Sequence, residues 1–403
     1  MDEAATDRRT PDGLSDTMDV VQLGVGVCGL VCAEQLAAHP NVDRLVLADR
    51  RTDAAERLAS RIPSGKASVE TVDGTDPHAL RVLLSRCDVV ISTMPWRLNR
   101  LVLDVAANVG TDYVDFGMPF DGTGPEFEAA SRMCSDAGIA ALVGMGQEPG
   151  ISDVFAMHGA TRLDRADEAH VFDGDTAMVE GLELFSVWSP VDLLDEMSVP
   201  AAVFADGRLI FVPPLSTSQT YTFPEPVGPL TVYKTNHDET YFLPMGIKTL
   251  KHASFNIHIG RAWVEAADSL RKLGLLRRDA VDVRGVRIRP MDLVAAALPA
   301  PVDLLGRIRG HACCVVEVKG EKEGRKAMVR TWTGIAYEDA YALHGTNATA
   351  YLVGTGGAIA TEMLLEGKVR EKGLVIPEQL SSEDFLQRLR DRGLQIHEQK
   401  VDL

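Results

Sequence analysis

Three glycines near the N-terminus have the spacing that a dinucleotide phosphate requires. An apolar run, residues 20–23, leads directly into the pattern Gly24-x-Gly26-x-x-Gly29. In such a turn the first glycine permits the bend, the second lets the backbone approach the pyrophosphate, and the third lets helix and strand pack closely. The pyrophosphate then lies at the positive N-terminus of the next helix. We therefore predict that a nicotinamide cofactor contacts Gly24, Gly26, Val27, Cys28 and Gly29.

An acid stands where the ribose of the cofactor would lie. The next apolar run, residues 45–48, ends in Asp49, twenty residues after Gly29. A carboxylate there accepts hydrogen bonds from the ribose hydroxyls and repels the 2′-phosphate of NADP. The sequence thus favours NAD. Arg50 and Arg51 follow at once and either could hold a 2′-phosphate, so NADP stays the alternative.

Alternating strand-like and helix-like segments are expected to position this turn. A helix-like segment, residues 30–38, follows the glycines, and the alternation continues to about residue 150. Asp76 and Pro77 have the residue types of a helix N-cap and first turn. A buried strand, residues 87–93, ends at a loop that we expect to contact the cofactor through Thr93, Met94 and Pro95. Such alternation indicates a parallel sheet with helices on both faces.

The second half of the chain has a different texture. From about residue 165, short segments rich in Val, Phe, Tyr and Thr are separated by Pro and Gly, which favours strands at residues 169–172, 184–188, 209–212 and 230–233. Residues 313–319 and 328–333 have the pattern of a hairpin across a polar turn, residues 320–324. From Asn347 the pattern is helical, ending in a charged amphipathic segment, residues 378–393.

These patterns predict an α/β protein of two domains. Residues 18–150 form a Rossmann dinucleotide-binding domain, and residues 151–345 form an α+β domain with a mostly antiparallel sheet, for the substrate and for dimerisation. Residues 346–403 are expected to be helices that pack back on the Rossmann domain, and residues 1–17 a disordered extension. We expect a homodimer.

Composition excludes several classes of function. The chain has 403 residues and a net charge of −17, which disfavours nucleic acid and anionic membranes as partners. No apolar run approaches the ~20 residues of a membrane span, and the N-terminus lacks the apolar core of a signal peptide. The six cysteines form no metal knuckle and the histidines are scattered. Free thiols, no metal site and a cytoplasmic location are therefore expected.

Several motifs, taken in order, resemble the saccharopine dehydrogenase-like family, and within it the lysine 6-dehydrogenase branch. The resemblance runs from about Asp19 to the C-terminus. It rests on Tyr113-Val114-Asp115, on residues 146–153 (GQEPGISD), on Trp188-Ser189-Pro190 with Asp195-Glu196-Met197, on residues 223–228 with 237–244, on residues 354–358, which open the family's C-terminal helix, and on residues 373–378. Met197, Asp173-Gly174-Asp175 and residues 256–260 depart from the family pattern, and these departures bear on the substrate more than on the fold.

The resemblance implies hydride transfer at a carbon that bears nitrogen. A lysine ε-amine has an ordinary pKa of about 10.4, so the site must help to remove a proton before hydride is lost. A carboxylate beside the nitrogen can do this. Glu148, at a predicted strand end, is the first candidate, and Asp153 is a second that could equally complement the dipole of its own helix. Glu239 and His237 match the family's acid and histidine, and Asp173 is a further substrate candidate.

Three functions follow from this reading. The first is NAD-dependent oxidative deamination of the ω-amine of L-lysine or a related amino acid to a semialdehyde. The second is reductive joining of an amine to an aldehyde or oxo acid, of the saccharopine or carboxynorspermidine type. The third is a nucleotide-binding regulator without turnover. Acids expected at the cleft favour an enzyme that acts on a small amine or amino acid.

Overall fold

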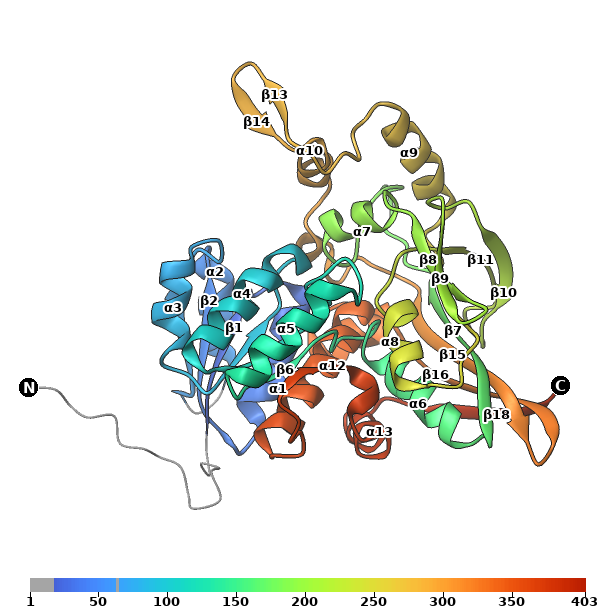
Figure 1. Cartoon of the computed structure of the whole chain (residues 1–403). Helices are drawn as coiled ribbons and strands as arrows, with labels where there is room; N and C mark the ends of the chain where they lie inside the picture. The colour runs from blue at the N-terminus through green and yellow to red at the C-terminus, as the bar shows by residue number, and fades with distance from the viewer. Residues whose placement is uncertain (1–17, 63–64) are drawn as a thin grey trace, which may run out of the picture.

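A parallel sheet forms the core of the first domain. The computed structural model describes residues 18–62 and 65–403, so the predicted extension, residues 1–17, lies outside the described residues. The seven strands run in the order β17-β6-β5-β4-β1-β2-β3 (Figure 1). They are β1 (Met18–Leu23), β2 (Val42–Asp49), β3 (Ala67–Thr71), β4 (Val89–Ser92), β5 (Asp112–Asp115), β6 (Ala140–Leu142) and β17 (Gly373–Val375). The strand order reverses beside β1, and ligands bind outside such a switch point.

Helices alternate with these strands and place the glycine turn. They are α1 (Val27–Ala38), α2 (Thr52–Arg61), α3 (Pro77–Leu84), α4 (Trp96–Val109) and α5 (Pro125–Asp136). Gly26 is the N-cap of α1, so the turn between β1 and α1 points the helix N-terminus at the cleft. Asp76 caps α3 as predicted, because its carboxylate accepts hydrogen bonds from the amides of His78 and Ala79.

The second domain is built on a nine-stranded sheet. Its main path runs β10-β11-β12-β7-β15-β16-β18, with β8 paired to β12 and β9 to β8. The β12–β7 pair is parallel and the others are antiparallel. The strands are β7 (Arg165–Asp175), β8 (Ala201–Ala205), β9 (Arg208–Val212), β10 (Ser218–Thr222), β11 (Pro229–Lys234), β12 (His252–Ile257), β15 (His311–Lys322), β16 (Arg325–Ala336) and β18 (His397–Asp402). The predicted α/β fold class, with a mostly antiparallel second sheet, is confirmed.

The helices of the second half complete the molecule. They are α6 (Ile151–Thr161), α7 (Pro190–Glu196), α8 (Glu239–Gly246), α9 (Arg261–Lys272), α10 (Pro290–Ala297), α11 (Tyr337–His344), α12 (Ala348–Leu365) and α13 (Ser382–Asp391). Short 3-10 turns occur at Pro301–Leu304 and Pro377–Gln379, and β13 (Val281–Val283) pairs with β14 (Val286–Ile288) in a small separate sheet.

One predicted strand is wrong. Residues 184–188 form no strand. Their backbone carbonyls find side-chain donors instead of a strand partner: Trp263 Nε1 donates to Phe185 O at 2.8 Å and Asn347 Nδ2 donates to Val187 O at 2.8 Å. The segment satisfies its buried polar groups without a ladder, which local propensity does not reveal.

The C-terminal segment serves both domains. Helix α12 packs on α1 and β17 joins the Rossmann sheet, but β18 pairs with the outer edge of β16. An unpaired edge can accept any extended segment, so this strand has little signal in its own sequence. Gly354 to Ala358 lie in the middle of α12, which begins at Ala348, and thus do not open the helix as expected. A Cβ on Gly356 would lie 2.1 Å from Gly146 O, so these glycines allow close approach.

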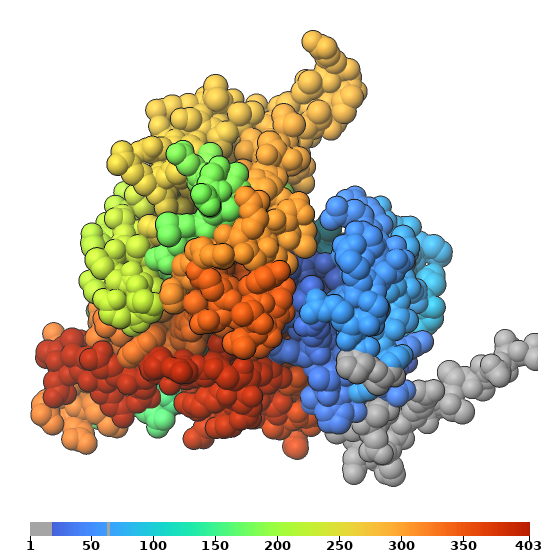
Figure 2. Space-filling model, turned by 180° about the vertical axis from the view of Figure 1, so that it is seen from behind, coloured from blue at the N-terminus to red at the C-terminus, as the bar shows by residue number. Residues whose placement is uncertain are grey.

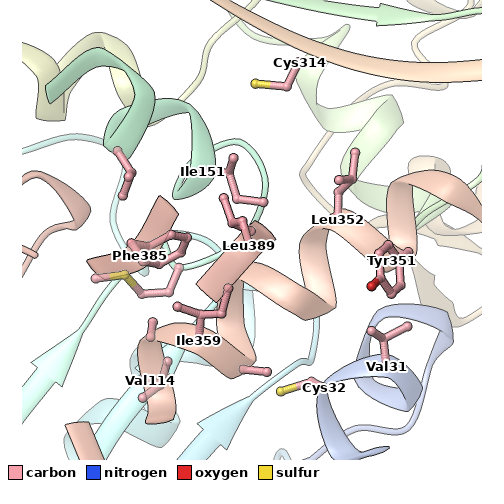
Figure 3. Close-up of a cluster of buried hydrophobic side chains, with 14 of the residues drawn as sticks. Val31, Cys32, Val114, Ile151, Cys314, Tyr351, Leu352, Ile359, Phe385 and Leu389 are labelled. Atoms are coloured by element: carbon pink, nitrogen blue, oxygen red, sulfur yellow. The ribbon is translucent and has the colours of Figure 1, made fainter. Parts of the chain in front are cut away.

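A shared core holds the two domains together. Figure 3 shows Val31 and Val114 of the Rossmann domain, Leu352 and Ile359 of α12, and Ile151 and Cys314 of the second domain within one buried cluster. Helix α12 is buried along nearly its whole length. Both domains that border the cleft therefore pack against helix α12.

Candidate active site

A cleft of about 660 Å³ lies at the switch point and is lined by both domains. All ten residues predicted to contact the cofactor line it: Gly24, Gly26, Val27, Cys28, Gly29, Asp49, Arg50, Thr93, Met94 and Pro95. The candidates Glu148, Asp173 and His237 line it too. Residues predicted from two separate stretches of sequence thus meet at one site.

The glycine turn is shaped around a space that the protein leaves open. Gly24 has a φ of +93°, and a Cβ on Gly29 would lie 2.6 Å from Thr93 Oγ1 and 2.8 Å from Gly24 O. A Cβ on Gly26, by contrast, would meet no protein atom within 4 Å. The first and third glycines are needed by the turn itself, and the second faces the cleft. These residues fit a dinucleotide whose pyrophosphate lies against Gly26 and the N-terminus of α1.

Two side chains hold this turn. Gln22 was not predicted from the sequence, and Thr93 was predicted only as a residue that contacts the cofactor. Gln22 is fully buried on β1, and its Nε2 donates to Gly24 O at 3.0 Å and to Gly29 O at 2.7 Å. Thr93 Oγ1 donates to Leu23 O at 3.1 Å and Gly24 O at 2.8 Å. A polar residue inside an otherwise apolar strand was the available signal for Gln22.

Asp49 is engaged with the backbone around the turn. Its Oδ2 accepts from Val25 N at 3.0 Å and its Oδ1 from Arg51 N at 2.9 Å. The carboxylate thereby ties the end of β2 to the glycine turn. Arg50 and Arg51 are exposed and also line the cleft. The end of the cleft where the cofactor ribose is expected therefore carries one negative and two positive side chains.

Glu148 and Asp173 form the acidic floor of the cleft. Glu148 precedes α6 and Asp173 lies near the end of β7, and the two carboxyl groups are close enough for each to influence the pKa of the other. Burial raises the pKa of Glu148 well above its ordinary value, and the charges of Asp173 and Glu239 raise it further. Burial followed by the charge of Asp175 raises the pKa of Asp173. The nearby Cys314 thiol acts against this rise in the pKa of Glu148, and the sequence analysis did not identify Cys314 as a site residue.

His237 is held as a cation at the cleft wall. Its Nδ1 donates to Glu239 Oε2, its Nε2 lies 4.0 Å from Glu196 Oε1, and its ring stacks on Phe255. Burial alone would lower the pKa of His237, but the Glu239 and Glu196 carboxylates raise it to about 10. Glu239 is fully buried and accepts from Ser152 Oγ at 2.9 Å. His237 therefore lines the cleft. Glu239 does not line it, but it positions His237 and stabilises its positive charge through their hydrogen bond.

Asp153 lies elsewhere. It is fully buried in the first turn of α6, does not line the cleft, and accepts from Gly150 N at 2.7 Å. The dipole role weighed for it fits this position, and the expected substrate contact has no support from the geometry. Its neighbour is Glu378, another buried acid that sequence reasoning did not identify.

Three further acids lie on the cleft wall: Asp192 and Glu196 were not identified as site residues from the sequence, and Asp238 directly precedes the candidate Glu239. Burial raises the pKa of Asp192 to about 6 and of Glu196 and Asp238 to about 7. Buried oxygens of Asp192, Glu196 and Glu148 lack a hydrogen-bond partner. Asp195, on the same helix, is already bound by Arg97 and by Arg278, whose Nη2 lies 2.6 Å away. The described residues hold no group of His, Cys, Asp and Glu with metal-site geometry.

Two family models match this chain. The model described as the saccharopine dehydrogenase NADP binding domain matches residues 20–142, and the model of the saccharopine dehydrogenase C-terminal domain matches residues 146–394. The cleft lies where these two regions meet. In the part of the chain that the structure describes, no helix is long and apolar enough to cross a membrane.

Some curated relatives align along nearly their whole length, and others over less than half of it. The chain is 26% identical to carboxyaminopropylagmatine dehydrogenase of Synechocystis, over 94% of this chain and 97% of the relative. It is 26% identical to carboxynorspermidine synthase of Vibrio cholerae, over 94% of this chain and 96% of the relative. Among solved structures, saccharopine dehydrogenase of Saccharomyces cerevisiae superposes with a TM-score of 0.70 at 20% identity, covering 95% of this chain and 100% of that one. A homospermidine synthase of Legionella pneumophila in complex with NAD gives a TM-score of 0.68 at 14% identity, covering 98% and 93%. These structures share the fold.

Proposed function

The chain belongs to the saccharopine dehydrogenase family and is an NAD(P)-dependent oxidoreductase, and from this premise we propose that it reductively joins a polycationic amine to a small carbonyl compound. The product would be a secondary amine. This is the second of the functions that the sequence suggested. Deamination of lysine, the first, has less support from the charges in the cleft.

One observation carries the proposal: beyond the glycine turn the cleft is lined by far more acids than cations. The acids are Asp121, Glu148, Asp173, Asp192, Asp195, Glu196 and Asp238. Among the described residues, one arginine, Arg278, lines this part of the cleft, and it forms an ion pair with Asp195. Buried carboxylates without partners have lost hydration that a bound ammonium group can replace. A ligand with more than one positive nitrogen fits this wall better than one amino acid.

The relatives support the same reading. Their names describe carboxylated polyamines, carboxynorspermidine and carboxyaminopropylagmatine. At about a quarter identity these names do not transfer by themselves, and the substrate here rests on the acids in the cleft. The carboxylate of such a product needs a positive partner, and His237 supplies a fixed positive charge on the wall.

Glu148 and Asp173 are placed to move protons in this reaction. The entering amine arrives as an ammonium ion and must lose a proton to become a nucleophile. We assign this proton to the Glu148–Asp173 pair. After the amine adds to the carbonyl carbon, the pair returns a proton to the hydroxyl group, which leaves as water and gives an iminium ion. When bound at the glycine turn, a reduced nicotinamide would supply the hydride for this carbon.

The choice between NAD and NADP stays a prediction in favour of NAD. Asp49 supports it, because a carboxylate beside the ribose disfavours a 2′-phosphate. The matching family model describes an NADP binding domain, and Arg50 and Arg51 line the same end of the cleft. We also infer that the substrate is a small molecule and that the chain acts as a homodimer.

A panel of substrates tests the proposal. The purified chain is mixed with NADH or NADPH, a small aldehyde that carries a carboxylate, and either a diamine or a monoamine of equal length, and loss of nicotinamide absorbance is followed. We expect turnover with diamines, a much higher KM for monoamines, and none without the aldehyde. Faster reduction of NAD by L-lysine alone would overturn the proposal. Calorimetric binding of nucleotide without turnover of any pair would support the regulator instead.

A further inference from the structure

A hairpin outside the cleft has an apolar face whose tip, Val283 and Val286, is left exposed by the described residues of this chain. We call residues 277–289 the arm. It contains β13 and β14, which form a two-stranded sheet separate from both main sheets. Figures 1 and 2 show this hairpin projecting from the body of the molecule. An isolated two-stranded hairpin is only marginally stable in water, so packing against another surface would stabilise it.

The hairpin is built to present one face. Val281 pairs with Ile288 and Val283 with Val286, so four β-branched residues share a face, while the Asp282–Arg287 pair lies on the other. The side chains of Val283 and Val286 are 48% and 58% exposed. Arg284 and Gly285 both have positive φ, at 54° and 83°. Two such residues make a tight turn whose twist suits a hairpin.

The charge of the arm is opposite to that of the chain. The arm contains five arginines and two aspartates, whereas the whole chain has a net charge of −17. Arg284 and Arg287 are exposed. A basic arm attracts an acidic surface, and two such arms repel each other. This charge distribution favours contact between the arm and the body of an acidic protein over contact between two arms.

We propose that the arm docks on the body of a second copy of this chain. Two copies related by a two-fold axis would each offer one arm and receive one, which closes the assembly. The valines would lose their exposure and the arginines would face the partner's acidic surface. The base of the arm includes Arg278, which lines the cleft and binds Asp195, so docking also fixes one wall of the site. The proposal rests on the homodimer inferred above and assigns its contact surface, and it does not depend on the reaction performed in the cleft.

Light scattering after size exclusion tests this surface. The wild-type chain should have twice the mass of 43.6 kDa at about 10 µM. The double variant Val283→Asp/Val286→Asp should fall to the mass of one chain. Val82→Asp is the matched control, because Val82 on α3 is 50% exposed and lies on another element. The control should keep the dimer. A monomeric wild type, or a double variant that stays dimeric, would overturn the proposal.

A second measurement uses the wild type and does not rely on the variant folding. Hydrogen exchange of amides in residues 281–288 is followed at high and low protein concentration. Dilution should speed exchange in the arm and leave exchange in α12 unchanged. High salt should weaken the dimer, because screening reduces attraction between exposed charges. Exchange in the arm that is independent of concentration would contradict docking, whatever reaction the cleft performs.

Discussion

At Gly26 the fold does not require a glycine, whereas cofactor binding does. Its φ and ψ of −78° and −174° suit any residue, and a Cβ there meets open space. We predict that Gly26→Val keeps the fold but abolishes binding of NAD and NADP, because the side chain would occupy the position of the pyrophosphate. Calorimetric titration and thermal unfolding measure the two effects.

The chain offers a close control for this variant. Gly124 is also a helix N-cap, with φ and ψ of −83° and −159°, and a Cβ there also meets open space. It does not line the cleft. Gly124→Val should bind cofactor as the wild type does. Unchanged affinity in a folded Gly26→Val protein would refute the dinucleotide assignment at this turn.

Glu148 is the residue that we assign to proton transfer. Glu148→Gln keeps the shape and removes the basicity, and loss of one acid–base group lowers rates by about 10² to 10⁴. Cofactor affinity should barely change, because Glu148 lies beyond the glycine turn, and one limb of the pH–rate profile should flatten. Steady-state kinetics over a pH series measures this.

The other Glu–Pro step of the chain gives the comparison. Glu225 precedes Pro226 and is exposed, so Glu225→Gln should retain wild-type rates. If Glu148→Gln turned over at a near wild-type rate with its pH dependence intact, the proton acceptor would have to be sought at Asp173.

At the scale of elements, α12 supports the turn that carries Glu148. A Cβ on Gly356 would approach Gly146 O to 2.1 Å, and the atom it meets is backbone. Helix propensity alone would make Gly356→Ala stabilising by up to about 1 kcal/mol. We expect the clash to win, with a loss of about 1 to 3 kcal/mol and a lower kcat as the turn shifts. Denaturant unfolding and kinetics check the sign.

The same elements show where local pattern suffices. Strands β1, β2 and β4 and helix α1 follow from apolar runs, the glycine turn and caps, all encoded within a few residues. Residues 184–188 and β18 do not, because their backbone partners come from distant segments: Trp263 and Asn347 in the first case and β16 in the second.

The whole molecule should lose stability as the pH rises from 5 to 8. Burial raises the pKa of Asp192 to about 6 and of Glu196, Asp238 and Glu378 to about 7. The folded chain thus holds more protons than the unfolded chain between pH ~4 and ~7, and the stability this gives is lost as the pH rises through the folded values. His237, with its pKa raised to about 10, adds a loss above pH ~6.5. Burial lowers the pKa of His170, which opposes this trend.

Thermal unfolding without cofactor at pH 5 and pH 8 checks this. The melting temperature should be lower at pH 8. Glu378→Gln removes one of these acids outside the cleft lining and should reduce the difference, whereas Glu383→Gln, at an exposed position on α13, should not. A melting temperature that rises with pH would contradict the buried, protonated state of these carboxyls.

The sequence alone determined the cofactor turn, the parallel sheet of the first domain, the family and Glu148 as a candidate. These depend on residues that act within a short stretch, where glycine geometry and hydrophobic period are decisive. The tertiary structure decided which acids share the cleft. Asp173 meets Glu148 because β7 ends there, whereas Asp153, three residues after Pro149-Gly150, turns inward on α6. Contacts between distant residues depend on strand register and helix packing, and the sequence does not state either one locally.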